Sequence, residues 1–383
     1  MPFSLPETLF FWEREKGFLN RASLVTSVAM TVEGPISNRD LGFILPHEHV
    51  LIDTSSFFVP INPESDRIRE NEPISLANLS WVRYNARHSR DCLSKLDEEA
   101  AVNEVGIFGR AGGNTIVDLT CREMGRDPLT LARISRSTGV HILIGTGFYT
   151  AGTHPPAVAQ ASAQELAAGM VNEINVGVDG TVIKAGIIGE IGCSWPLADG
   201  ERKVLEAAAI AQSQTGLAIT IHPSRNEAGP NDAIKVLRST GADLSRVVIC
   251  HMDRCGYSLA TRLNILTSGC YVEYDLFGKE GYYPAQPALA DGHLPDMPND
   301  VGRIKEIADL IERGWIDRIL ISHDNCLKTN YTRWGGPGFA HIIERTIPYM
   351  QIYGYTEKQI YQLTRNNPAC MITGDDPSIN LKP

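Results

Sequence analysis

The stretch AGIIGEIG, residues 185–192, is apolar at nearly every position instead of alternating between apolar and polar residues. A strand with apolar residues on both faces is typical of a parallel sheet that helices cover on both sides. Its one charged residue, Glu190, would be costly to bury without a partner. The stretch therefore predicts a buried parallel strand whose carboxylate meets a cation.

Seven further short apolar runs resemble this stretch, and helix-like segments lie between them. Segments 97–110, 201–214 and 301–314 show helical spacing, and we expect Asp199 to cap the second and Gly314 to end the third. Strands that alternate with helices in this way predict a (β/α)8 barrel, the TIM barrel, although a doubly wound open sheet has the same alternation. The predicted strands are 42–52, 114–120, 141–147, 183–191, 217–222, 247–251, 270–275 and 318–322.

The chain has 383 residues, enough for two or three average domains or for one barrel with insertions. No linker interrupts the strands, so we expect one barrel over residues 31–383 and an N-terminal extension over residues 1–30. Acidic residues in the extension argue against a secretory or mitochondrial presequence. Long loops at 53–90 and 278–300 follow predicted strands, where barrels place their substrate contacts.

Charge and cysteine content exclude several classes of protein. The 35 basic and 45 acidic residues give a net charge of −10, the wrong sign for a general nucleic-acid binder. The eight cysteines are scattered without a C-x-x-C pair, which indicates a reducing compartment and a cytoplasmic protein. No apolar run reaches the ~18 residues that a membrane span needs. We therefore expect neither nucleic acid nor membrane as a partner.

Six potential metal ligands stand at or just after the ends of the predicted strands. His47 and His49 are two residues apart, so in a strand both side chains point to the same side. Six nitrogen and oxygen donors are too many for one tetrahedral zinc ion with an open position, but they fit two ions that share a carboxylate. One ion would bind His47, His49 and Asp324, the other His222 and His251, and Glu190 would bridge. Imidazole with carboxylate favours Zn²⁺, with Mn, Fe and Co as alternatives.

The chain resembles the phosphotriesterase family of the amidohydrolase superfamily, and within it the phosphotriesterase-related proteins. The resemblance runs from about Val32 to Gly374, and it implies the same barrel and the same six ligands. Glu190 stands where the bacterial organophosphate hydrolases have a carboxylated lysine, and Leu276 where they have a shuttle histidine. The motifs that carry the resemblance are LPHEH (45–49), GEIGCSWPL (189–197), IHPSR (221–225), HMDR (251–254), EYDLFG (273–278) and HD (323–324).

The ligand set and the resemblance together predict a hydrolase that cleaves an amide bond of a small N-acylated, anionic substrate through a metal-bridging hydroxide. Asp324 would accept the hydroxide proton and return it to the leaving amine, with Glu190 as the bridge. A lactonase, a carboxylesterase or a phosphotriesterase-like esterase is the alternative, and a non-catalytic metal-binding barrel is a third. Related barrels are often homodimers, but no interface signature decides the oligomeric state.

Four residues near the ligands are candidates for substrate binding. Arg225 and Arg254 each follow a histidine ligand by three residues, and a guanidinium can bind a carboxylate or sulfonate through two hydrogen bonds. The alternative is that these arginines form structural ion pairs with Asp253 or Glu123. Tyr149 and Tyr274 either line the pocket or pack in the core.

Overall fold

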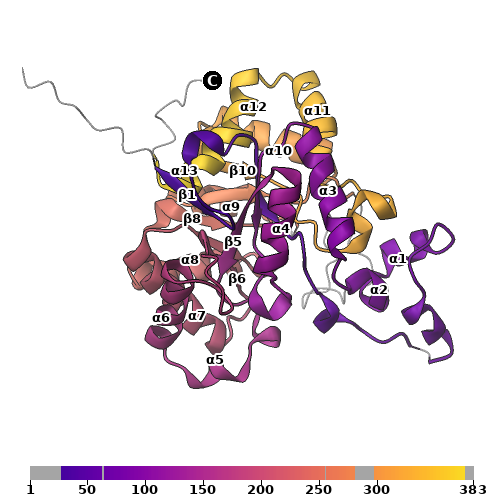
Figure 1. Cartoon of the computed structure of the whole chain (residues 1–383). Helices are drawn as coiled ribbons and strands as arrows, with labels where there is room; N and C mark the ends of the chain where they lie inside the picture. The colour runs from indigo at the N-terminus through magenta and orange to yellow at the C-terminus, as the bar shows by residue number, and fades with distance from the viewer. Residues whose placement is uncertain (1–26, 63, 255, 281–296, 376–383) are drawn as a thin grey trace, which may run out of the picture.

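The computed structural model of the chain describes residues 27–62, 64–254, 256–280 and 297–375. Its main sheet has eight parallel strands in the order β10-β9-β8-β7-β6-β5-β4-β3. Helices surround this sheet (Figure 1). The strands are β3 Ile44–Glu48, β4 Thr115–Asp118, β5 His141–Thr146, β6 Ile187–Gly192, β7 Ile219–His222, β8 Val247–Ile249, β9 Tyr271–Tyr274 and β10 Ile319–Ile321. All eight predicted strands are present, and the predicted (β/α)8 barrel is confirmed.

The barrel closes where its first strand, β3, meets its last strand, β10. The amide nitrogen of Asp324, just after β10, donates to the carbonyl oxygen of His47 at 3.1 Å. The Ser322 hydroxyl oxygen lies 2.8 Å from the same oxygen and accepts from the His47 amide at 3.1 Å. These contacts bring the predicted ligands of the two strands to one seam.

The helices form the outer layer of the barrel. The longest of them, α7, packs a row of small buried residues, Ala207, Ala208 and Ala211, toward the sheet. Their bounds are α1 Leu79–Tyr84, α2 Arg90–Leu93, α3 Glu98–Arg110, α4 Pro128–Thr138, α5 Pro156–Gln160, α6 Ala163–Asn175, α7 Asp199–Thr215, α8 Gly229–Ser239, α9 Leu259–Thr267, α10 Asp300–Glu312, α11 Ile347–Ile352, α12 Glu357–Tyr361 and α13 Asn367–Thr373.

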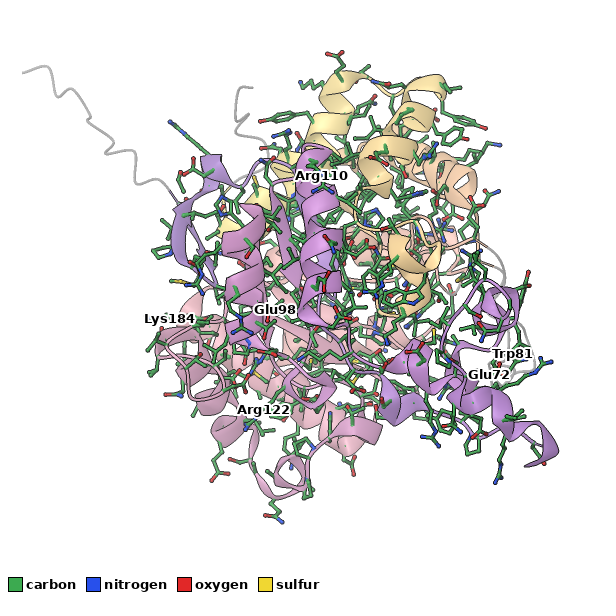
Figure 2. The ribbon with its side chains drawn as sticks, turned by 45° about the vertical axis from the view of Figure 1, so that its right-hand side comes forward. Glu72, Trp81, Glu98, Arg110, Arg122 and Lys184 are labelled. Atoms are coloured by element: carbon green, nitrogen blue, oxygen red, sulfur yellow. The ribbon has the colours of Figure 1, made fainter. Side chains whose placement is uncertain are left out.

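The three helices expected from the sequence are α3, α7 and α10. In α3 the Asp97 side chain accepts from the Ala100 amide at 2.7 Å and caps the helix. Glu98 and Arg110 stand at its two ends, each beside the helix pole of opposite charge (Figure 2). The predicted cap of α7 is wrong, because Asp199 is its first helical residue and Ala198 is the cap. Glu201 instead accepts from the Ala198 amide at 3.1 Å, so a buried carboxylate inside the first turn replaces the expected cap.

A small antiparallel hairpin, β1 Val28–Thr31 with β2 Gly34–Ser37, precedes the barrel. Residues 1–26 of the predicted extension lie outside the described residues, and β1 begins within its last three positions. The amide of Val32 donates to the carbonyl oxygen of Ile142 in β5 at 2.8 Å. A side chain at Gly186 would lie 2.4 Å from the carbonyl oxygen of Met30, so this close approach needs glycine. The hairpin is thereby attached to the strands β5 and β6.

Two loops were expected to carry substrate contacts. The loop over 53–90 contains α1 and several 3₁₀ turns and ends at the first residue of α2, whereas most of the loop over 278–300 lies outside the described residues. No helix in the described part of the chain has the length and apolar character needed to cross a membrane.

Candidate metal centre

The six predicted ligands come together at the carboxyl ends of β3, β6, β7, β8 and β10, the end of the barrel where active sites form. His47 and Glu190 lie within strands, while His49, His251 and Asp324 stand just past strand ends. His251 and Asp324 have positive φ angles of 59° and 50°. Non-glycine residues in that region store backbone strain, which accumulates at functional sites.

Glu190 lies at the centre of the cluster. Its Oε1 is 2.7 Å from Nδ1 of His222, 3.0 Å from Nε2 of His251 and 3.5 Å from Nε2 of His47. Its Oε2 lies 4.0 Å from Nε2 of His49. One carboxylate therefore reaches histidines of both predicted ion sites, as a bridging ligand must.

Asp324 stands on the β3 side of the cluster. Its Oδ1 lies 3.3 Å from Nε2 of His49 and 3.9 Å from Nε2 of His47. Its Oδ2 accepts from the Lys279 ammonium at 3.0 Å. Burial would raise the pKa of Asp324, but Lys279 and the nearby histidines outweigh burial and hold that pKa well below its usual range. The carboxylate is therefore ionised at neutral pH.

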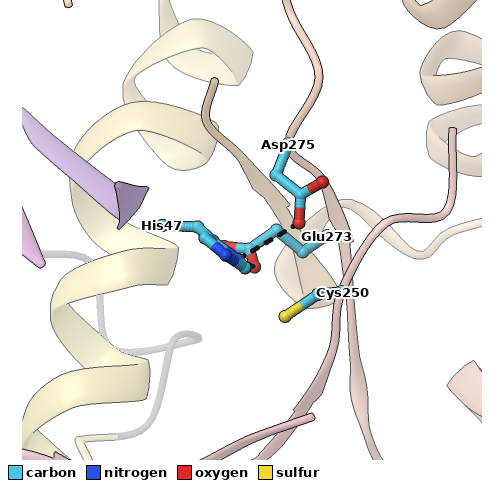
Figure 3. Close-up of side chains that lie close together, drawn as sticks. All are labelled: His47, Cys250, Glu273 and Asp275. Carbon is cyan, nitrogen blue, oxygen red and sulfur yellow. Dashed lines mark hydrogen bonds and ion pairs between the residues drawn. The ribbon is translucent and has the colours of Figure 1, made fainter. Parts of the chain in front are cut away.

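Two buried carboxylates, Glu273 from β9 and Asp275 just past its end, lie beside the ring of His47 (Figure 3). Nδ1 of His47 lies 3.0 Å from Glu273 and 3.2 Å from Asp275. Asp275 also accepts from Nδ1 of His251 at 2.7 Å. A proton on Nδ1 leaves a lone pair on Nε2 of each ring, the arrangement in which histidines bind metals.

Side chains in this region form three compact groups that could hold a metal ion. They are His47–Glu190–His251, His47–His49–Asp324, and His47–Cys250–Glu273–Asp275. The third group uses Nδ1 of His47, which already donates to the two carboxylates. We therefore interpret that group as support for His47, and the first two as the donor atoms of the cluster.

The pKa directions follow from this crowding. Burial would raise the pKa of Glu190, but His222 and His47 outweigh burial and hold it well below its usual range. Burial, and after it the charge of Arg254, lowers the pKa of His222 to about 3. Burial also opposes protonation of His251, but Asp275 outweighs it and raises the His251 pKa. The cluster therefore combines ionised acids with a neutral His222.

Two of the four predicted substrate residues lie at the cluster. Nη1 of Arg254 lies 2.8 Å from Nε2 of His222, and Oη of Tyr149 lies 3.1 Å from the same atom. Arg225 is half-buried on the loop after β7. Tyr274 is fully buried away from the cluster, and its hydroxyl accepts from Arg262 at 2.9 Å. The structure thus brings Arg254 and Tyr149 to the cluster and does not bring Tyr274.

Asp253 and Glu123, the acids considered as ion-pair partners of Arg225 and Arg254, have other partners. Asp253 pairs with Arg303 of α10 at 2.6 Å, and Glu123 accepts from the Tyr149 amide at 2.6 Å. Glu123 thus holds the backbone of a residue beside the cluster.

Three residues near the cluster were missed from the sequence: Glu273, Asp275 and Lys279. Glu273 and Asp275 are two residues apart on one strand, so they share a side in the same way as His47 and His49. That spacing was a usable signal. Lys279 lies in the turn after β9, and no pattern in the sequence indicated its contact with Asp324.

Lys184 is the lysine that precedes Glu190 in the chain. It precedes β6 and stays partly exposed (Figure 2), whereas Glu190 is buried at the centre of the cluster. Glu190, and not Lys184, therefore occupies the centre of the cluster.

Comparison with known proteins gives one consistent result. The phosphotriesterase family model matches residues 27–372. The N-acetyltaurine hydrolase of Rattus norvegicus is 40% identical over 353 residues, which cover 92% of this chain and 99% of that protein. The phosphotriesterase-related protein of Nematostella vectensis is 40% identical over 353 residues, with 91% and 99% covered. The solved structure of a resiniferatoxin-binding protein from Rhodobacter sphaeroides has a TM-score of 0.85 at 33% identity, covering 92% of this chain and 96% of that one. The chain therefore belongs to the phosphotriesterase family of metal-dependent hydrolases.

Proposed function

We propose that this enzyme hydrolyses the amide bond of a small N-acylated anion, with N-acetyltaurine as the first candidate substrate, and that it uses two divalent ions, Zn²⁺ first. The observation that carries the proposal is the central position of Glu190 between the histidines of β3 and those of β7 and β8. The name of the rat relative supports the choice of an amide and of an anionic substrate.

The donor set fits a metal. In the described part of the chain, Nε2 of His47 is buried without a hydrogen-bond partner, and the nearest carboxylate oxygens lie 3.5 and 3.9 Å away. A buried polar atom without a partner is costly, and an ion between it and the carboxylates would remove that cost. His47, His49 and Asp324 would hold one ion, His222 and His251 the other, and Glu190 both.

Two divalent ions would supply Lewis-acid polarisation of the substrate carbonyl and a water of lowered pKa. The protein itself supplies the proton carrier. The Asp324 carboxylate is ionised, and it is placed to take a proton from the attacking water and to return it to the departing nitrogen. Amide hydrolysis depends on that return, because an amine anion is a poor leaving group.

The choice of an anionic substrate follows from charge. Arg254 is buried beside His222, and its Nη2 donates to the carbonyl oxygen of Pro223 at 2.6 Å. This hydrogen bond orients the guanidinium at the His222 side of the cluster. A sulfonate or carboxylate there would gain charge-assisted hydrogen bonds, whereas a neutral group would gain none. Tyr149 lies on the same side, where its ring would contact the acyl end of the substrate.

The proposal is tested by metal analysis and a substrate panel. The purified chain, loaded with Zn²⁺ and freed of excess ion, should carry about two ions per chain. N-acetyltaurine and N-acetyl amino acids should be hydrolysed faster than lactones and aryl phosphotriesters, with kcat/KM measured for each. A chain without bound ions, whose activity no added metal restores, would contradict the proposed chemistry. Faster hydrolysis of lactones would contradict the amide assignment and favour the esterase alternative.

A further inference from the structure

Glu48 lies between the two histidines of the LPHEH motif and points away from their ion site. It is fully buried, and both of its carboxylate oxygens are used. Oε1 accepts from the Ser322 hydroxyl at 2.8 Å, the His323 amide at 2.9 Å and the His323 ring Nδ1 at 2.7 Å. Oε2 accepts from the Asn325 amide at 3.0 Å. All these donors belong to residues 322–325.

The two backbone donors flank Asp324. Glu48 holds the amide before Asp324 and the amide after it, while the amide of Asp324 itself donates to the carbonyl oxygen of His47 at 3.1 Å. Between these bonds Asp324 adopts a φ of 50°, which costs free energy for a residue with a side chain. Three consecutive amides are thus fixed by two consecutive residues of β3, and the strained conformation directs the Asp324 carboxylate toward His49.

The tautomer of His323 follows from its second partner. Its Nε2 accepts from the amide of Ile342 at 3.1 Å, so Nδ1 must carry the proton that Glu48 accepts. His323 is therefore a neutral donor and no ligand, although it stands next to one. Tyr331 fixes the other side of this turn by donating to the carbonyl oxygen of His49 at 2.6 Å, and its hydroxyl also lies 3.0 Å from the carbonyl oxygen of Asn325.

We propose that Glu48 is a positioning residue that sets the Asp324 carboxylate for the ion site of His47 and His49. It acts through the backbone of residues 323–325 and touches neither substrate nor ion. The inference rests on the proposed function, because it concerns one of the two ion sites. The proposed effect concerns only that ion, because Glu48 contacts neither His222 nor His251 in the described part of the chain.

The decisive variant is Glu48→Gln, which keeps the size of the side chain but turns one acceptor oxygen into a donor that faces an N–H group. We expect the dissociation constant of one of the two zinc ions to rise by ~10–100-fold and that of the other to stay within about 2-fold. Competition against a chromophoric zinc chelator measures both constants without any use of activity. Glu48→Gln added to Asp324→Asn should weaken that ion little further, because Glu48 acts on the ion only through the Asp324 carboxylate.

Glu104→Gln is the matched control. Glu104 is a glutamate of α3 that is 2% exposed, and it also holds a distant loop, through the Thr332 hydroxyl at 2.5 Å and the Arg333 amide at 3.1 Å. It contacts no residue of the cluster. This variant should lose stability as Glu48→Gln does, with both zinc constants unchanged.

A milder pair of variants covers the case in which Glu48→Gln does not fold. His323→Asn keeps a donor near the position of Nδ1, while His323→Gln moves the donor toward that of Nε2. Only His323→Gln should weaken the same zinc ion.

The outcomes separate the two claims. If Glu48→Gln folds and binds both zinc ions with wild-type dissociation constants, the inference is overturned and the proposed function stays intact. If Glu48→Gln does not fold, equal zinc dissociation constants in the two His323 variants have the same meaning. A wild-type chain that binds no zinc at all would overturn both.

Discussion

The two sides of the ligand cluster differ in what surrounds their histidines. On the β3 side, His47 is fully buried, its Nδ1 faces Glu273 and Asp275, and Nδ1 of His49 pairs with the Thr120 hydroxyl at 3.0 Å. On the β7 side, the His222 side chain is 12% exposed, and its outer nitrogen meets Arg254 and Tyr149. Under the proposed function, the β3 side would hold its ion in a single geometry, and the β7 side would meet the anionic substrate.

Glu190→Gln should have the largest effect, because it removes the charge that both sides share. We expect kcat/KM to fall by about 10³-fold or more and bound zinc to fall below two ions per chain. Steady-state kinetics and metal analysis measure the two effects. The exposed Glu99→Gln on α3 is the control. Retention of both ions and of activity would remove Glu190 from its bridging role.

Asp324→Asn changes the β3 side alone. The loss of a proton acceptor should lower kcat by ~10²–10⁴-fold while the fold, followed by circular dichroism, stays unchanged. Asp309→Asn, which breaks only a surface pair with Arg313, serves as the control. Turnover near the wild-type rate in Asp324→Asn would show that another group carries the proton.

Asp275→Asn tests the carboxylate that contacts a histidine on each side of the cluster. Removing this carboxylate should weaken zinc binding by ~10–100-fold, because Nδ1 of His47 and of His251 both lose a charged acceptor. Chelator competition measures the change. An effect confined to one ion would show that Asp275 supports only one of the two histidines.

The same variant changes the pH dependence of the metal-free chain. Burial lowers the pKa values of His47 and His251, but Cys250, Glu190 and then Asp275 outweigh burial at His47, and Asp275 outweighs it at His251, so both pKa values are raised. A raised histidine pKa stabilises the fold below about pH 6.5, and that stability is lost as the pH rises through the raised value. The Tm of the metal-free wild type should therefore fall more steeply above pH 6.5 than that of Asp275→Asn. Parallel curves in thermal denaturation would contradict the role of Asp275.

Arg254→Met tests the substrate side. A lost charge-assisted hydrogen bond is worth about 1.5–3 kcal/mol, so KM for anionic amides should rise by roughly 10–100-fold with kcat nearly unchanged. A neutral lactone is the control substrate and should lose nothing. Arg225→Met, made in parallel, shows whether the second arginine contributes. An equal loss on the neutral substrate would refute anion binding by Arg254.

Tyr274→Phe should have the smallest effect. Its hydroxyl contacts Arg262 outside the cluster, so kcat and KM should not change, while unfolding should become easier by about 0.5–1.5 kcal/mol. Tyr149→Phe, by contrast, should change the kinetics, because Tyr149 lies beside His222. Altered kinetics in Tyr274→Phe would reverse this assignment.

The fold and the six candidate ligands could be read from the sequence for one physical reason. Strands that are buried on both faces are continuous apolar runs, so a histidine or acid at the end of a run is conspicuous, as Glu190 is. The supporting carboxylates were harder to predict, because Glu273 and Asp275 lie on either side of Tyr274, which was itself the candidate site residue. The alternation of β9 sends Tyr274 outward when its two neighbours point inward.

The contacts of Glu48 and Lys279 could not be read from the sequence. Glu48 connects β3 to Asn325 over a separation of 277 residues, and Lys279 connects the turn after β9 to Asp324 over a separation of 45. Their partners are set by how the barrel closes, which no local pattern reports. Asp199 failed as a cap for a related reason, since Glu201 takes that place while also accepting from Ser194 and Ala151 outside the helix.

The seam between β3 and β10 has a consequence for the folding of the chain during its synthesis. His47 and His49 leave the ribosome early, but Asp324 emerges only after all eight barrel strands have been synthesised. Under the proposed assignment, the ion site on this seam cannot be completed cotranslationally until the last strand docks. Metal loading there would report that the whole barrel has been made and closed, and chains truncated before residue 324 would remain unable to complete it.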